Sequence, residues 1–248
     1  MTLEQFFAEN REVAVAFSGG VDSAYLLYAA KRYAARVKAY YVSTVFQPAF
    51  ELEDARRLAN ELGADMQVLH VDVLMSGAVV ENPPDRCYHC KNTLFRQILR
   101  AAESDGFALL LDGTNASDDA GDRPGMRALR ELSVRSPLRE CGLTKAEIRR
   151  LSKEAGLFTW DKPAYACLAT RIRTGEEITL QKLKQTEKAE GFLFGLGFRD
   201  FRVRMVDNTA KLELREADLP LLLENREKIV AELRKDYDSV LLNLEVRK

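Results

Sequence analysis

The sequence predicts an α/β fold in which a doubly wound parallel sheet is followed by a small C-terminal α+β domain. From residue 12 to about residue 160, short β-branched or aromatic runs alternate with longer amphipathic stretches, the pattern of a parallel sheet covered by helices. A loop-rich segment at 161–175 interrupts this alternation, and a mixture of helical and strand patterns follows it. We therefore expect one domain at 1–160 and another at 176–248, joined by the connecting loop at 161–175.

In the first domain, short apolar runs predict the strands and longer amphipathic stretches predict the helices. The predicted strands are Glu12–Phe17, Val37–Val42, Met66–Val71 and Ala108–Leu111, with a weaker candidate near Val134. The predicted helices are Ser23–Ala35, Phe50–Leu62, Asn92–Glu103 and Thr144–Gly156. The last helix has a clear start signal, because Thr144 is followed three residues later by Glu147, as in a capping box.

The C-terminal domain reads as a mixed sheet with helices. A helix is predicted at Thr179–Leu196. Strands are predicted on either side of the hairpin signal Asp207-Asn208, and a further helix and strand follow them. These elements are Phe201–Val206, Lys211–Leu214, Leu221–Arg234 and Val240–Val246.

Composition places the chain among ordinary soluble globular proteins. It has 248 residues, of which 46% are hydrophobic and 30% charged, and its formal net charge is −1. That balance argues against a broad nucleic-acid-binding face, so DNA is not an expected partner. No apolar run is long enough to span a bilayer and the N-terminus does not resemble a signal segment, so we expect a cytoplasmic protein without a membrane partner. Its four cysteines are then better read as ligands or nucleophiles than as disulfides.

The most informative stretch is the turn Ser18–Ser23, which reads Ser-Gly-Gly-Val-Asp-Ser. It follows an apolar strand and opens a helix, and adjacent glycines let bare backbone N–H groups approach an anion at the helix N-terminus. The spacing matches neither a Walker loop nor a dinucleotide-binding turn. We therefore predict a phosphate-binding loop whose donors to the β- and γ-phosphates are Ser18, Gly19, Gly20 and Ser23.

Asp22 requires a different role, because phosphates repel a carboxylate unless a hard cation lies between them. We assign it to Mg²⁺, or to a water on Mg²⁺, with helix capping as the alternative. Ser43, at the end of the next predicted strand, lies where an adenine would contact the backbone.

A second cluster follows the strand Ala108–Leu111. Asp112 and Gly113 fall at the carboxyl end of that strand, at the same sheet edge as the phosphate loop, and suggest a metal or nucleotide site. The acidic residues Asp118 and Asp119 are read equally well as a surface turn. Arg123, next to Pro-Gly, is predicted to contact an anion.

The cysteine pattern decides between chemistries. Cys87 and Cys90 lie three residues apart at the start of a helix, where the helix dipole favours thiolates and metal binding. A zinc site would need further ligands from Cys167, Cys141, His70 and His89. Three thiolates and one iron without a protein ligand would instead suit a 4Fe-4S cluster that can bind an extra sulfur. Cys141 is predicted to be a buried structural cysteine.

Several motifs together resemble the LarE family of ATP-dependent sulfur transferases, which belong to the PP-loop ATP pyrophosphatases. They are the phosphate loop, Asp112-Gly113-Thr114-Asn115 with Arg123-Pro124-Gly125, the run from Lys162 to Arg171, and Arg202-Val203-Arg204. The resemblance covers about residues 12 to 245 and implies the adenine nucleotide alpha hydrolase-like fold. It implies that ATP adenylylates a carboxylate of a pyridinium dicarboxylate mononucleotide, that pyrophosphate leaves, and that sulfur replaces AMP to give a thiocarboxylate.

The resemblance also implies roles for residues outside the phosphate loop. Arg171, Arg202 and Arg204 would bind the phosphate and carboxylates of the substrate, although one of the two strand arginines reads equally well as solvent-facing. Glu190 and Glu213 are weaker candidates for substrate or metal contact. The expected cofactors are ATP, Mg²⁺ and a 4Fe-4S cluster. The expected partners are the mononucleotide, a sulfur-donor protein or sulfide, and further copies of the chain in a homo-oligomer.

The family supplies sulfur in two ways. Some members sacrifice a cysteine that becomes dehydroalanine, and others resemble this chain in carrying Cys87, Cys90 and Cys167 for a 4Fe-4S cluster. Ala166 occupies the position of the sacrificed cysteine and Cys167 follows it, so the cluster route is favoured and the sacrificial route stays open. The remaining alternatives are tRNA thiolation or amide synthesis by another PP-loop enzyme, and a non-enzymatic adenine-nucleotide-binding module. A sensor has no need of a cysteine triad, and the chain shows no basic, zinc-ribbon or glutaminase module.

Overall fold

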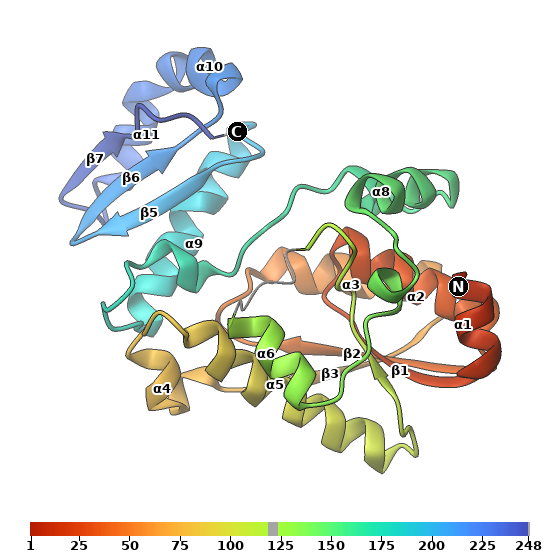
Figure 1. Ribbon diagram of the computed structural model, residues 1–248. Coiled ribbons are helices and arrows are strands. Elements are labelled where there is room, and N and C mark those ends of the chain that lie inside the picture. Colours follow the sequence, from red (N-terminus) through yellow and green to blue (C-terminus); the bar gives the residue numbers. More distant parts are fainter. Residues whose placement is uncertain (119–123, 248) are drawn as a thin grey trace. The chain divides into compact units, whose positions relative to one another are not determined.

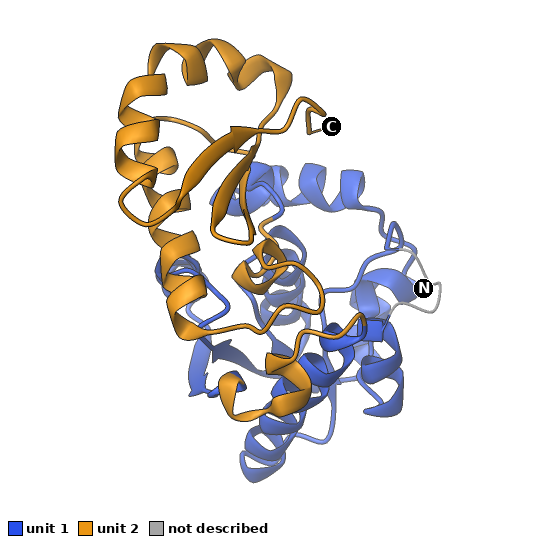
Figure 2. Ribbon diagram, turned by 90° about the vertical axis from the view of Figure 1, so that its left-hand side faces the viewer, with its two compact units in different colours: residues 1–73, 85–164 blue, residues 74–84, 165–248 orange. Residues whose placement is uncertain are grey.

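A computed structural model describes residues 1–118 and 124–247. The chain divides into two compact units, coloured in Figure 2. Unit 1 comprises Met1–Val73 and Asp85–Ala164, and unit 2 comprises Leu74–Pro84 and Tyr165–Lys248. The early segment Leu74–Pro84 is tied into unit 2 by backbone hydrogen bonds, because Gly175 N–H donates to Asn82 O (2.8 Å) and Ile178 N–H donates to Val80 O (2.8 Å).

Unit 1 is built on the predicted parallel sheet, which has the strand order β3-β2-β1-β4. Its strands are β1 (Glu12–Ala16), β2 (Arg36–Ser43), β3 (Asp65–His70) and β4 (Leu110–Leu111). All three pairings are parallel, with Val13 opposite Val37 and Ala14 opposite Leu110. The weak strand predicted near Val134 is reduced to a single bridge between Leu111 and Arg135. The doubly wound α/β prediction is confirmed.

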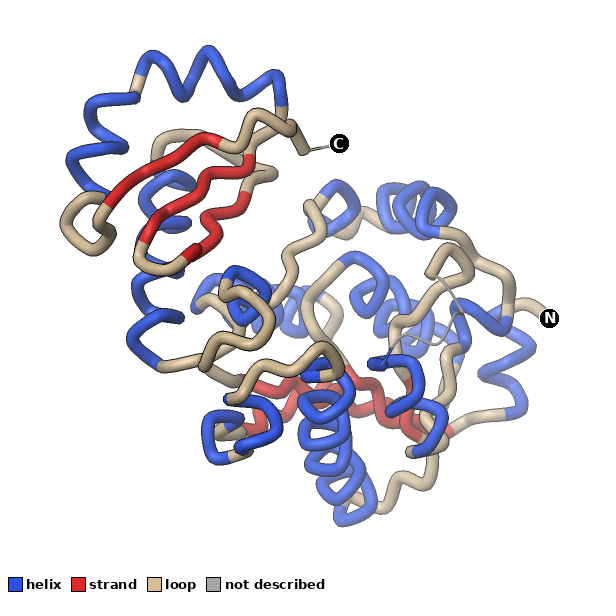
Figure 3. Tube along the Cα trace, turned by 60° about the vertical axis from the view of Figure 1, so that its left-hand side comes forward, coloured by secondary structure: helices blue, strands red, loops and turns tan. Residues whose placement is uncertain are grey.

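The helices of unit 1 cover both faces of this sheet (Figure 3). They are α1 (Leu3–Glu9), α2 (Val21–Tyr33), α3 (Ala49–Glu61), α5 (Arg86–Ser104), α6 (Pro124–Glu131), α7 (Pro137–Glu140) and α8 (Lys145–Glu154), with a 3-10 turn at Phe158–Asp161. The capping box predicted for α8 is present, since Thr144 Oγ1 accepts from Glu147 N–H and Glu147 reaches back to Thr144 N–H. Helix α5 begins at Arg86 rather than at the predicted Asn92. The prediction missed the first turn because that turn carries polar residues without an apolar period.

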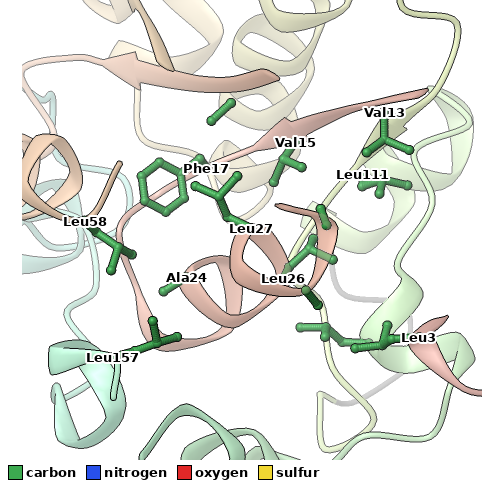
Figure 4. Close-up of a cluster of buried hydrophobic side chains, with 14 of the residues drawn as sticks. Leu3, Val13, Val15, Phe17, Ala24, Leu26, Leu27, Leu58, Leu111 and Leu157 are labelled. Carbon is green, nitrogen blue, oxygen red and sulfur yellow. The ribbon is translucent and has the colours of Figure 1, made fainter. Parts of the chain in front are cut away.

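Alternation along the strands builds a core on each side of the sheet. Val13 and Val15 of β1 face one cluster, where α2 contributes Leu26 and Leu27 (Figure 4). Ala14 points to the opposite cluster, together with Ile98 and Ala102 of α5 and Tyr40 and Val42 of β2. Because both faces are buried, the strands read as apolar runs rather than as alternating ones.

Unit 2 contains the second, mixed sheet. The hairpin predicted at Asp207-Asn208 joins β5 (Arg202–Val206) to β6 (Thr209–Glu213), and β7 (Ser239–Leu242) pairs with β6 in parallel. Asp207 adopts the left-handed conformation that such a turn requires, with φ 52°. The helices of this unit are α4 (Gly77–Val80), α9 (Leu180–Gly195), α10 (Leu219–Glu224) and α11 (Arg226–Leu233). Short 3-10 turns lie at Leu168–Arg171 and Glu216–Asp218. A further 3-10 turn, Val73–Met75, includes the last residue of the first segment of unit 1 and the first residues of unit 2.

The single helix predicted at Leu221–Arg234 is two helices. Asn225 ends α10 and starts α11, and its side-chain Nδ2 donates to Leu221 O at 3.1 Å. An asparagine that hydrogen-bonds to the backbone in this way competes with helix propagation, which explains the break. No helix of the described residues is long and apolar enough to cross a bilayer.

Candidate active site

The phosphate loop lies between the end of β1 and the start of α2. Gly19 has φ +73°, and a Cβ at this position would lie 3.2 Å from Ala55 Cβ of α3, so both conformation and space require glycine. Gly20 is the N-cap of α2 and offers no side chain to cover the first-turn N–H groups. The backbone N–H groups at the positive end of this 13-residue helix therefore have no side-chain cap. Such a helix end binds anions.

The two serines of the loop hold its curvature. Ser18 Oγ and Ser23 Oγ lie 3.0 Å apart, and Ser18 N–H donates to Ser23 Oγ at 3.2 Å. Ser23 Oγ also donates to Gly20 O at 3.2 Å. Both hydroxyls therefore close the loop on itself.

Asp22 lies at the start of α2 and pairs with a residue from a distant helix. Lys145 Nζ, on the first residue of α8, donates to Asp22 Oδ2 at 2.5 Å. Asp22 Oδ1 is buried and has no hydrogen-bond partner among the described residues. Burial raises the pKa of Asp22, and the hydrogen bond and charge of Lys145 act in the opposite direction. A buried carboxylate oxygen that lacks a donor has the chemistry of a hard-cation ligand, so this site fits Mg²⁺.

The second predicted cluster packs directly onto the phosphate loop. Asp112 is 6% exposed, and its oxygens accept from Thr114 Oγ1 (2.5 Å) and Ser136 Oγ (2.6 Å). A Cβ on Gly113 would lie 2.8 Å from Ser23 N. The absence of a side chain at Gly113 thus lets this segment approach the first turn of α2 closely.

The remaining residues of that cluster divide by position. Asp118 Oδ2 accepts from Asn115 N–H at 2.8 Å, as expected of a turn. Asp119 and Arg123 lie outside the described residues.

We predict that Gly113→Ala displaces the start of α2 and weakens ATP binding. The added methyl group would meet backbone rather than a flexible side chain, and overpacking of this kind costs about 1–3 kcal/mol of folding free energy. Gly191→Ala is the matched control, because nothing lies within 4 Å of its Cβ position inside α9. The control should be stabilised by about 0.5–1 kcal/mol. Urea unfolding and ATP titration of both variants test this, and equal stability of the two would contradict the packing argument.

An apolar cavity of about 150 Å³ begins beside the phosphate loop. Its walls come from the ends of β1 and β2, from α3 and from α5, and they include Ser18, Tyr40, Tyr41, Glu51 and Phe95. A largely apolar cavity next to a phosphate site suits a flat heteroaromatic ring. Ser43 stands at the end of β2 outside the lining of this cavity, and its carbonyl accepts from Val71 N–H at 3.0 Å.

Lys162 is a site residue to which the sequence reasoning gave no role. Its Nζ lies 2.7 Å from Asp54 Oδ2, 3.6 Å from Glu51 Oε1 and 3.5 Å from Gly19 O, and its side chain is 13% exposed. It therefore ties the segment before Tyr165 to α3 and to the phosphate loop. Its only sequence signal was its place in the run from Lys162 to Arg171.

Cys87 and Cys90 lie about one turn apart near the start of α5, as the sequence predicted. Cys87 is exposed and lines an open cavity of about 360 Å³, and Cys90 is half-buried. His89 pairs with Asp85, the N-cap of the helix, at 3.3 Å. Cys167 belongs to unit 2, where it is the half-buried N-cap of the turn Leu168–Arg171. Within the described residues, no group of three or more His, Cys, Asp or Glu side chains is gathered as a metal site.

Cys141 lies apart from the other cysteines. It ends α7 and packs against the main core of unit 1. Burial raises the pKa of its thiol, which keeps it protonated at neutral pH. Cys141 is half-buried rather than fully buried, and its structural role stays a prediction.

The predicted substrate arginines and glutamates all lie in unit 2, where each of the two glutamates forms an ion pair with an arginine. Arg171 is 1% exposed and forms a bidentate pair with Glu190, with Nε–Oε1 2.8 Å and Nη2–Oε2 2.9 Å. Arg204 Nε donates to Glu213 Oε1 at 3.0 Å, and its side chain is 37% exposed. Both glutamates therefore accept from arginines of the same unit.

Arg202 differs from the other two arginines. It is 6% exposed, its Nη1 donates to Phe201 O at 2.6 Å, and its distance to Asp200 Oδ1 is 3.8 Å. Burial, followed by the charge of Arg171, lowers the pKa of Arg202. The guanidinium groups of Arg202 and Arg171 lie 5.4 Å and 4.8 Å from the ring of Tyr165, which the sequence reasoning did not single out.

Comparison with known proteins agrees with this geometry. The profile of the asparagine synthase family matches residues 4–114, which include the phosphate loop. An uncharacterized protein of Synechocystis sp. is 38% identical over 215 residues, which cover 86% of this chain and 80% of that protein. An uncharacterized protein of Methanocaldococcus jannaschii is 30% identical over 240 residues, with coverages of 96% and 91%.

A further relative has a named activity. The pyridinium-3,5-bisthiocarboxylic acid mononucleotide synthase of Lactiplantibacillus plantarum is 34% identical over 218 residues, which cover 87% of this chain and 79% of that enzyme. Identity at this level across most of both chains, together with the phosphate loop on a parallel sheet, shows common family membership. The chain therefore belongs to the LarE family, the family of this synthase.

Proposed function

We propose that this protein is an ATP-dependent sulfur transferase acting on a pyridinium dicarboxylate mononucleotide. ATP adenylylates a carboxylate of that substrate, pyrophosphate leaves, and sulfur then displaces AMP to give a thiocarboxylate. The observation that carries the proposal is the phosphate loop at the uncapped N-terminus of α2, on a chain whose relative makes a bisthiocarboxylic acid mononucleotide.

The chain's own groups support cleavage between the α- and β-phosphates. The N–H groups at the start of α2 would hold the β- and γ-phosphates, and the apolar cavity beside Ser18 would hold the adenine. Asp22 would hold Mg²⁺ through Oδ1, and the ion when bound would supply charge neutralisation to the departing pyrophosphate. Lys145 and Lys162 place ammonium groups beside the loop, and each of them is paired with a carboxylate, Asp22 and Asp54 respectively. Pyrophosphate held in this way is a good leaving group for attack by a carboxylate.

The acceptor is proposed to bind at the arginines of unit 2. Arg202 and Arg204 would contact its phosphate and carboxylates, since an anion would offset the burial and the charge of Arg171 that lower the pKa of Arg202, and Arg204 is partly exposed. Planar guanidinium groups suit both kinds of anion because they donate in pairs.

For the sulfur, we propose a 4Fe-4S cluster held by Cys87, Cys90 and Cys167. The first two lie one helical turn apart at the positive end of α5, and thiolates are the usual ligands of such clusters. The cluster when bound would supply an iron that carries an external sulfide. The sulfur source would be sulfide or a sulfur-donor protein, and we expect the enzyme to act in the cytoplasm as a homo-oligomer.

The test is product analysis with ATP, Mg²⁺ and the pyridinium dicarboxylate mononucleotide. We expect pyrophosphate from the adenylylation step and, when sulfide is added, an equal amount of AMP together with a thiocarboxylate by mass spectrometry. ADP and phosphate as products would refute the assigned cleavage. AMP formation that requires transfer RNA and not the mononucleotide would assign the protein to tRNA thiolation instead.

A further inference from the structure

Arg171 is enclosed by the segment that carries Cys167. Its Nη1 donates to Ala166 O (2.8 Å), to Thr170 Oγ1 (2.9 Å) and more weakly to Cys167 O (3.4 Å). These contacts close the short turn on both sides of Cys167. At 1% exposure, the guanidinium has no surface left for a ligand.

Glu190 holds the other side of the same guanidinium. It lies on α9, is 4% exposed, and both of its oxygens accept from Arg171. Oε1 also accepts from Val203 N–H of β5 at 2.9 Å, and Oε2 accepts from the hydroxyl of Tyr165. The carboxylate therefore connects a helix, a strand and the cysteine segment.

This pattern differs from that of an arginine available for substrate. A buried ion pair contributes little net stability, because desolvation offsets its attraction, but removing one partner leaves an unpaired buried charge. Arg204, in contrast, is 37% exposed and also donates to Thr170 O, so it reaches the same turn from the outside. The geometry thus separates an outer arginine that can meet a ligand from an inner one that cannot.

We propose that Arg171, Glu190 and Tyr165 form a positioning network that fixes the backbone around Cys167, and so aims its thiol, rather than contacting the substrate. This network belongs to the site of the proposed function. It depends on that function in one respect, namely that Cys167 takes part in sulfur transfer. Both routes of sulfur supply need this thiol in a defined direction. A misplacement of about 1 Å can cost about 10²-fold in rate.

The test measures the alkylation rate of each cysteine in the full-length, reduced and metal-free protein. Iodoacetamide labelling is followed by peptide mass spectrometry, with Cys141 of unit 1 as the internal standard. In Arg171→Lys the charge stays and the planar fork is lost, so Cys167 should label about tenfold faster while Cys141 changes by less than about twofold. Arg215→Lys is the matched control, because Arg215 pairs with Asp218 in the same unit, away from this turn, and should leave both rates unchanged.

Tyr165→Phe provides a second, milder variant. It removes one hydrogen bond to Glu190 without leaving a buried charge unpaired, and should raise Cys167 labelling about threefold. In both variants kcat for thiocarboxylate formation should fall while KM for the mononucleotide stays within about twofold.

Two results would overturn the positioning role. One is unchanged Cys167 labelling in Arg171→Lys together with a mononucleotide Kd raised tenfold or more, which would make Arg171 a substrate contact. The other combines two observations. Arg171→Lys raises the labelling rates of Cys167 and Cys141 equally, which means that the whole fold has loosened, and Tyr165→Phe leaves the labelling rate of Cys167 unchanged. Labelling needs neither ATP nor turnover, so this outcome is independent of whether sulfur transfer itself is found.

Discussion

Asp22→Asn should lower the rate of AMP and pyrophosphate formation by about 10²-fold or more without destabilising the fold. The substitution keeps the shape of the side chain and removes the charge that a magnesium ion requires. Asp22 Oδ1 is the buried oxygen with no protein donor, so the loss falls on the cation site, while an asparagine oxygen in the place of Oδ2 can still accept from Lys145. Release of pyrophosphate, followed with a coupled assay across a range of Mg²⁺ concentrations, measures the effect.

The stability side of this prediction follows from the pKa of Asp22. Burial raises that pKa above the unfolded value, so the folded state favours the protonated acid. Folding stability is therefore higher at low pH and falls as the pH rises from the unfolded pKa through the raised folded one. At neutral pH the full cost of burying the Asp22 charge is present, and an asparagine removes that cost. The ammonium group of Lys145 is exposed enough for water to solvate it in the variant. The Tm of the variant should equal or exceed that of the wild type.

Asp65→Asn is the control, since Asp65 is a largely exposed carboxylate at the opposite, N-terminal end of a sheet strand. It should change neither rate nor Tm. If Asp22→Asn retained the wild-type rate, or lost activity only in proportion to a lower Tm, the cation role would be wrong.

Signals carried by adjacent residues were enough to predict the fold. Consecutive glycines after an apolar run marked the turn into α2, Thr144 and Glu147 marked the start of α8, and Asp207-Asn208 marked the β5–β6 hairpin. Each of these signals reflects local backbone conformation or hydrogen bonding between neighbouring residues, so a single sequence is enough to identify it. The helix break at Asn225 was missed because asparagine is tolerated in many helices and acts here through its own side chain.

The pairing of charged residues in the site was beyond the reach of such local signals. The sequence reasoning placed Arg171 and Glu190 in the site as separate substrate contacts, whereas the structure pairs them across 19 positions of the chain. Likewise, Lys162 meets Asp54 from a segment 108 positions away. Long-range pairs of this kind depend on which elements pack together, and periodicity contains no information about that. The predicted roles of the phosphate loop, the three cysteines, Arg202 and Arg204 stay predictions that the proposed experiments address.

Cys167→Ser should abolish thiocarboxylate formation and the AMP release that accompanies it, while pyrophosphate still forms at close to the wild-type rate in the first turnover. The phosphate loop, Asp22 and the apolar cavity all belong to unit 1, whereas Cys167 belongs to unit 2, so the change removes no group from the ATP site. Adenylylation and sulfur transfer are thereby separated into two measurable steps. The adenylylated substrate should accumulate and be trapped by hydroxylamine, which reacts with the activated carboxyl group.

The same variant distinguishes the two routes of sulfur supply. On the cluster route, anaerobically prepared wild-type protein is brown with about four irons per chain, Cys167→Ser is bleached, and sulfide supports repeated turnover. Cys141→Ser should keep both colour and activity, because that thiol is half-buried against the core of unit 1 and held protonated. On the sacrificial route the protein is colourless, turns over once, and loses about 34 Da at Cys167, the mass of hydrogen sulfide. Thiocarboxylate formed at the wild-type rate by Cys167→Ser would exclude this cysteine from both routes, and the sulfur would then have to come from Cys87 or Cys90 at the start of α5.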